Sequence, residues 1–195
     1  MISTFRRRYL LRTNLLLLVL CLFLTSAYAQ NERKIEILNS EYMEFDRNIG
    51  SGVIKYVGDV AFKHDDMLLY CDSAWFFSEE NIVEAFNSIH IIQADTLHLY
   101  GDILKYLGNE KIAEVRKNVT LVDKETVLTT DHLDFDLVSN VGYYEHHGQL
   151  INGDNILDSE RGYYYSNINT VYFMDSVVIV NPDYNIYADT LRYHT

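Results

Sequence analysis

The sequence is poor in cysteine and proline, with two cysteines and one proline in 195 residues. Cys21 lies within the first 29 residues, so a chain without that segment keeps only Cys71 and cannot form an intramolecular disulfide. No stretch rich in proline, glycine or serine divides the remaining chain, which favours one continuous domain. Stability must therefore come from packing and backbone pairing.

Long apolar runs are also absent, except at the start of the chain. Basic residues that include Arg6, Arg7 and Arg8 precede an apolar run from Leu15 to Leu24, and a small-x-small Ala-Tyr-Ala sequence ends at Ala29. This pattern predicts a signal peptide over residues 1–29 and an exported mature domain over residues 30–195. Nothing later in the chain resembles a membrane helix, which needs about 20 apolar residues.

Positive charge is scarce in the mature chain. The net charge of −12 becomes −16 without residues 1–29, because that segment carries four arginines and no acidic residue. Nucleic acid and anionic membrane surfaces are therefore poor partners.

An acidic residue recurs along the chain at spacings of 29 to 31 residues, and we call these residues the acidic anchors. The anchors are Glu41, Asp72, Asp102, Asp131, Glu160 and Asp189. Four residues after each anchor stands an aromatic side chain: Phe45, Phe76, Tyr106, Phe135, Tyr164 and Tyr193. The recurring unit of about 30 residues predicts a stacked repeat.

Apolar residues alternate with polar ones on both sides of each anchor, which is typical of strands with one buried face. The alternation changes phase at the anchor: Leu99 lies three residues before Asp102, whereas Leu104 lies two residues after it. Such positions can share one face only if the strand bends or bulges at the anchor. No segment has the period of an amphipathic helix, so the sequence predicts an all-β fold.

The residues that could carry chemistry do not form a recognisable site. The seven histidines lack partners at metal-ligand spacing and are expected on the surface. The acidic anchors recur in every unit, as corner residues would, whereas a catalytic pair would break the pattern. No nucleophile motif or phosphate-binding loop is present. The sequence therefore predicts no catalytic residue, no cofactor and no metal, and a protein that is not an enzyme.

The segment from Leu97 to Tyr106, Leu-His-Leu-Tyr-Gly-Asp-Ile-Leu-Lys-Tyr, followed by Ile-Ala-Glu-Val at 112–115 and Asn118-Val119, resembles the OstA-like, LptA-like family of lipopolysaccharide-transport proteins. The resemblance extends over residues 35–195. It implies an open β-jellyroll of stacked, mostly antiparallel strands with a V-shaped cross-section. It also implies a periplasmic location, with association with the outer membrane as a further expectation.

The resemblance implies a lipid-binding bridge or carrier that takes part in lipopolysaccharide transport and outer-membrane assembly. Its partners would be the acyl chains of lipopolysaccharide or a related glycolipid, and other jellyroll modules or its own copies, joined end to end. The residues expected to line the lipid groove, chosen by strand parity, are Leu69, Phe76, Leu99, Leu104, Tyr106, Val115, Leu128, Leu133, Phe135 and Leu191.

An alternative function stays open. A structural scaffold or adhesin would fill the same repeat with side chains and bind protein partners through its strand edges. The last unit stops at Thr195 without a polar cap, so the native chain either continues or pairs edge to edge. The fourth unit also departs from the pattern, because Gly162 stands where other units have leucine, and the continuity of the inner face is an open question there.

Overall fold

The computed structural model describes residues 34–45, 52–94 and 96–195, which lie in one compact unit, Arg33–Thr195. The predicted signal peptide and Cys21 lie outside the described residues. Within the described residues, no helix is both long enough and apolar enough to cross a membrane.

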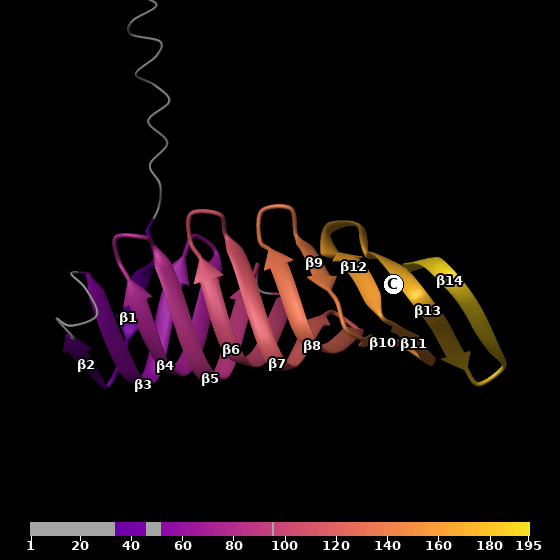
Figure 1. Cartoon of the computed structure of the whole chain (residues 1–195), viewed down its shortest axis with the longest axis horizontal. Coiled ribbons are helices and arrows are strands. Elements are labelled where there is room, and N and C mark those ends of the chain that lie inside the picture. The colour runs from indigo at the N-terminus through magenta and orange to yellow at the C-terminus, as the bar shows by residue number, and fades with distance from the viewer. Residues whose placement is uncertain (1–33, 46–51, 95) are drawn as a thin grey trace, which may run out of the picture. The chain divides into compact units, whose positions relative to one another are not determined.

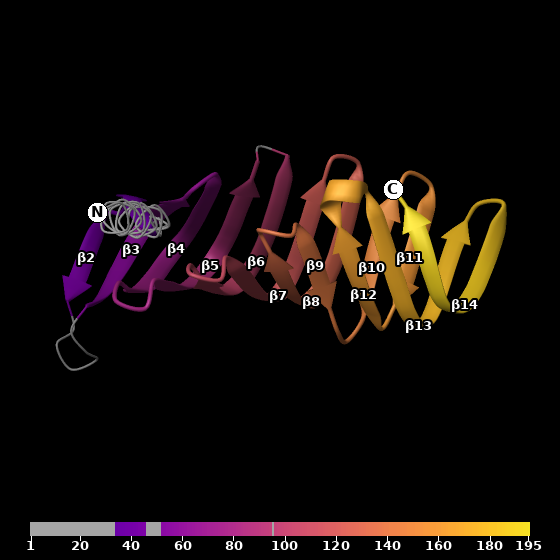
Figure 2. The ribbon, with the colours of Figure 1, turned by 90° about the horizontal axis from the view of Figure 1, so that it is seen from above.

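A single antiparallel sheet accounts for almost all the described residues, and the only helical segment among them is the short 3-10 helix Ser166–Ile168. The strands are β1 (Glu36–Asn39), β2 (Tyr42–Phe45), β3 (Val53–His64), β4 (Met67–Phe77), β5 (Ile82–Gln93), β6 (Leu97–Leu107), β7 (Ile112–Asp123), β8 (Thr126–Asp136), β9 (Val141–Tyr144), β10 (Gly148–Asn152), β11 (Asn155–Ser159), β12 (Arg161–Tyr165), β13 (Thr170–Asn181) and β14 (Tyr184–His194). They follow one another along this unit from β2 to β14 (Figures 1 and 2). The predicted all-β, antiparallel fold is confirmed.

The strands bend at the acidic anchors, as the change of phase predicts. In the pairing of β6 with β7 the register shifts between Tyr100 and Ile103, where Asp102 lies opposite two residues, Lys117 and Asn118. The extra residue therefore belongs to the neighbouring strand, and the anchor is the single residue opposite it. Asp102 accepts a hydrogen bond from the Asn118 amide at 2.6 Å, which gives the anchor a structural use at the corner.

The bulge recurs with the period of the sequence. Pairs of residues with positive φ stand at 58–59, 87–88, 117–118, 146–147 and 175–176. The pair at 146–147 separates β9 from β10, both of which pair with β8, so these two strands are the halves of one bent strand. In the same way, β11 and β12 lie on either side of the anchor Glu160 and both pair with β13.

The bulges divide the sheet into two facing layers. Layer A carries the turns at 65–66, at 94 and 96, and at 124–125, 153–154 and 182–183, and layer B carries those at 78–81, 108–111, 137–140 and 166–169. Phe62 in layer A packs against Tyr56 and Phe76 in layer B, with ring centroids 5.7 and 5.9 Å apart. The core therefore lies between the layers, which meet at the bulges and face each other towards their turns.

Candidate functional site: the interior between the layers

The residues predicted to line a groove all lie in one interior cluster. Leu69, Leu99 and Leu128 come from layer A, and the others come from layer B. Every one of them is buried except Leu191, which is half-buried on the last strand and packs against the same cluster. Strand parity therefore predicted the inward direction of these side chains correctly, while lipid contact at them stays a prediction.

The interior is filled by side chains. Leu104 and Phe135 are each 1% exposed, and Leu133 is fully buried. These side chains belong to one packed cluster, which leaves little of their surface accessible to an alkyl chain as the layers stand. A lipid chain could occupy this space only if the two layers moved apart.

The fourth unit continues the interior, because one large side chain compensates for two glycines. Tyr144 is fully buried where the preceding units have Ala85 and Val115, and it occupies the space beside Gly148 and Gly162. A Cβ atom at Gly148 would lie 2.4 Å from the Tyr144 ring, and one at Gly162 would lie 2.5 Å from it. The apolar face is therefore continuous through this unit.

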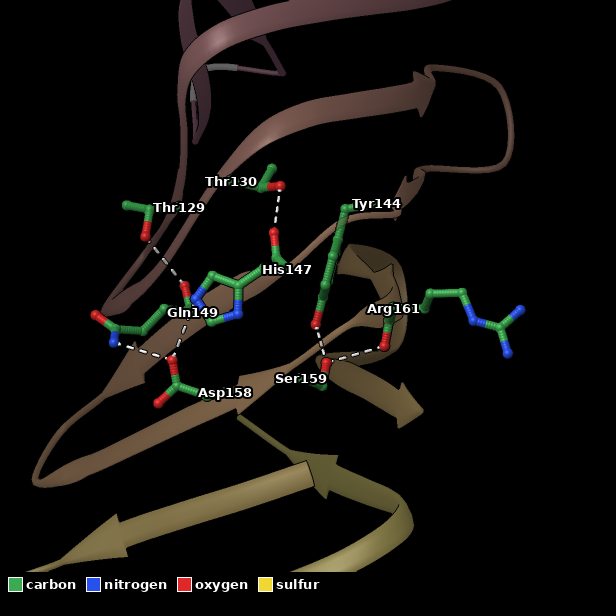
Figure 3. Close-up of polar contacts among 8 residues, drawn as sticks. All are labelled: Thr129, Thr130, Tyr144, His147, Gln149, Asp158, Ser159 and Arg161. Carbon is green, nitrogen blue, oxygen red and sulfur yellow. Dashed lines mark hydrogen bonds and ion pairs between the residues drawn. The ribbon is translucent and has the colours of Figure 1, made fainter. Parts of the chain in front are cut away.

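The hydroxyl of Tyr144 has its own buried partner. It lies 2.6 Å from Ser159 Oγ, and the Ser159 hydroxyl donates to the carbonyl of Arg161 at 2.9 Å (Figure 3). Burial raises the pKa of Tyr144 to about 12. The ring therefore serves as neutral core, and it does not act as an acid or base near neutral pH.

Tyrosine hydroxyls bridge the two layers near their turns. Tyr106 Oη lies 2.7 Å from His64 Nδ1, and Tyr164 donates to the carboxylate of Asp123 at 2.8 Å. Farther along, Tyr193 donates to Asn152 Oδ1 at 3.1 Å. Burial raises the pKa values of Tyr106 and Tyr164, and the nearby carboxylates Asp65 and Asp123 act in the same direction.

Two lysine side chains make further bridges between the turns themselves. Lys111 in a layer-B turn lies 2.5 Å from Asp65 in a layer-A turn, and Lys124 donates to Asn169 Oδ1 at 3.0 Å. Sequence reasoning missed these contacts, although the partners all lie 41 to 46 residues apart. These separations are all near one and a half repeats, a regularity that points to the contacts only once the bend of the strands and the stagger of the layers are known.

His64 corrects one expectation from the sequence. It was expected on the surface, but it is 3% exposed because Val60, Phe62 and His64 share the inward parity of β3. Among the described residues, no group of three or more His, Cys, Asp or Glu side chains could hold a metal ion. Cys71 is buried, and desolvation followed by the nearby Asp72 charge raises the pKa of its thiol to about 12.

The two ends of the sheet expose apolar side chains. Met43 and Phe45 on β2 are exposed, as are Tyr184, Ile186 and Tyr187 on β14. Among the described residues β14 pairs only with β13, so one side of its backbone has no strand partner. An unpaired strand edge of this kind is a template for pairing with another chain.

Bent antiparallel strands stacked around a continuous apolar interior define a β-jellyroll. A family model described as OstA-like protein matches residues 32–189, and the chain belongs to the OstA-like family.

Among solved structures, the chain is similar to LptH of Pseudomonas aeruginosa, described as the LptA-homologous periplasmic component of a lipopolysaccharide transport device. The match has a TM-score of 0.51 and 15% sequence identity, and it covers 58% of this chain and 83% of LptH. At that identity the likeness shows the fold alone. No curated protein matches the chain.

Proposed function

We propose that this protein is a lipid-binding bridge or carrier module in lipopolysaccharide transport and outer-membrane assembly, with no enzymatic activity. The observation that carries the proposal is the continuous apolar interior of an OstA-like fold, which passes through every unit, the fourth included. The mature chain is strongly acidic, so it would repel an anionic headgroup and must bind the lipid through its acyl chains.

The energetics of such binding suit a carrier. Each buried methylene contributes about 0.8 kcal/mol relative to water. Acyl chains are removed from water in a membrane to the same extent as in the protein interior. The interior can therefore shield a lipid in transit without driving its movement. Net transport therefore requires energy from another component.

Photo-crosslinking tests the proposal directly. A photoreactive amino acid at Leu104, Leu133 or Phe135 is expected to crosslink lipopolysaccharide in cells, because these side chains point between the layers. Lys105 and Asp134 alternate with them on the outer face and serve as matched controls. Adducts formed at the controls but never at the inner positions would contradict lipid binding in the interior.

A second function is favoured by the filled interior. A structural scaffold needs no space between its layers and would bind protein partners through its strand edges. Native mass spectrometry of the purified mature protein separates the two functions: a carrier is expected to retain glycolipid, whereas a scaffold should match the mass of the polypeptide alone.

End-to-end association through β14 is part of both functions. Ile186 on this edge strand is 41% exposed. Ile186→Lys is expected to shift the protein towards monomer in analytical ultracentrifugation, since a charge on an edge strand opposes strand pairing. Ile168→Lys, at an exposed apolar residue in the 3-10 helix, should leave the association unchanged. If both variants self-associate as strongly as the parent protein, the association does not go through this edge.

A further inference from the structure

The polar contacts between the two rows of turns form a line that closes the interior along one side. We call this line the seam and define it by five contacts: His64–Tyr106, Asp65–Lys111, Asp123–Tyr164, Lys124–Asn169 and Asn152–Tyr193. Each contact joins a residue of layer A to one of layer B, and none joins strands that pair in the sheet.

The seam differs in chemistry from the space it encloses. The interior is lined by aliphatic and aromatic side chains, whereas the seam consists of hydroxyl, amide, imidazole, carboxylate and ammonium groups. Asp123 is 5% exposed and His64 is 3% exposed, so several of these polar groups are buried and need their partners. Water or a hydroxylated ligand could satisfy them if the layers parted, but a hydrocarbon chain could not.

The opposite side of the interior is built to bend. There the bulges place pairs of residues with positive φ in five successive units, among them Lys117-Asn118 and His146-His147. The ladder hydrogen bonds run between neighbouring strands within each layer and not across the interior. Rotation of one layer about the line of bulges would therefore break the seam and leave the strand pairing intact.

We propose that the seam is the route by which an amphiphile reaches the interior: the layers part along it, the acyl chains enter sideways, and the polar head stays at the seam. This inference rests on the proposed function, because it assumes that lipid occupies the interior. It assigns the seam residues the role of a latch, broken when lipid enters and remade around it.

A hollow beside the seam offers a place for the head of the lipid. It has a volume of about 270 Å³, and Asp123, Thr126, Asn152 and Asn169 are among the residues that line it. The lining combines carboxylate, hydroxyl and amide groups with the ammonium group of Lys124, so it offers both donors and acceptors to a polar head. The competing route is through the ends of the sheet, where Leu191 is only half-buried.

A reversible crosslink across the seam distinguishes the two routes. The mature protein would carry Lys124→Cys and Asn169→Cys together with Cys71→Ala, because alanine already occupies the equivalent position at Ala188. A bismaleimide with a reducible disulfide in its linker then ties the layers together. The probe is purified rough lipopolysaccharide in detergent micelles, and uptake is followed by photo-crosslinking at Leu133.

Tying the seam is expected to slow uptake at least tenfold, and reduction of the linker should restore the original rate. The matched control carries Lys105→Cys and Glu114→Cys, which pair across β6 and β7 on the outer face of layer B. The same reagent there joins neighbouring strands and not the layers, so uptake should be unchanged.

A variant that weakens the latch gives an independent measurement. Tyr164→Phe removes the donor to Asp123, and Phe135 shows that a phenyl ring fits the equivalent position in the preceding unit. Uptake is expected to be about fivefold faster, the factor that corresponds to one lost hydrogen bond.

Two results would overturn the inference in distinguishable ways. If the tied protein takes up lipid as fast as the untied protein, lipid enters through the ends, and the proposed function survives. If the untied protein never takes up lipid, the proposed function fails together with the route.

Discussion

Gly162→Leu is expected to lower the free energy of unfolding by about 3 kcal/mol, although it restores the residue that Leu104 and Leu133 place at the equivalent position. A Cβ atom at Gly162 would meet the ring of Tyr144 at 2.5 Å. That ring is fully buried, and it already lies close to Gly148 on its other side. The loss should appear in urea denaturation followed by circular dichroism.

Compensating substitutions test whether packing is the cause. Combining Gly162→Leu with Gly148→Val and Tyr144→Val reproduces the side chains of the preceding unit, where Val115, Val119 and Leu133 fill the space, and should recover most of the lost stability. Gly153→Ala is a control for backbone strain alone, since Gly153 has a φ of +57° and open space around it. It should cost about 1 kcal/mol. A stable single variant would show that Tyr144 does not occupy this space.

Phe135→Ala is expected to cost about 4 kcal/mol, because it leaves a cavity between two layers that meet across the interior. Phe135 is 1% exposed, and its neighbours belong to paired strands that cannot collapse inward without breaking their ladders. Thermal and urea denaturation of a protein that comprises residues 30–195 measure the loss. A loss below 1 kcal/mol would mean that the interior around Phe135 is loosely packed.

The matched control for this experiment is Val138→Ala, three residues along the chain. Val138 is 66% exposed in the turn after β8, so its truncation should change stability by no more than about 0.5 kcal/mol. A large loss for Phe135→Ala beside a small one for Val138→Ala would show that the interior is well packed. The layers would then have to separate before lipid could enter.

Much of the fold was predictable from local patterns. The alternation around Asp102 predicted the inward direction of Leu99 and Leu104 and the bend between them, because side-chain parity is a property of a single strand. The absence of helical periodicity likewise predicted the all-β class. Which strand carries the extra residue of each bulge depends on pairing between strands, so the pattern of one strand alone did not show it.

The seam could not be predicted in the same way. His64 and Tyr106 are 42 residues apart, and their contact requires both the bend at the bulges and the stagger between the layers. The compensation of Gly148 and Gly162 by Tyr144 was unpredictable for the same reason. Each of the three residues departs from the repeat in the sequence, and only the fold places them together in one space.

The sequence by itself determined the repeat, the strand parity and the apolar character of one face, because each follows from side chains a few positions apart. Only the tertiary structure decided that this face is closed and filled. Closure depends on how two layers stack after every strand has bent, and the hydrogen bonds between those layers join residues more than 40 positions apart.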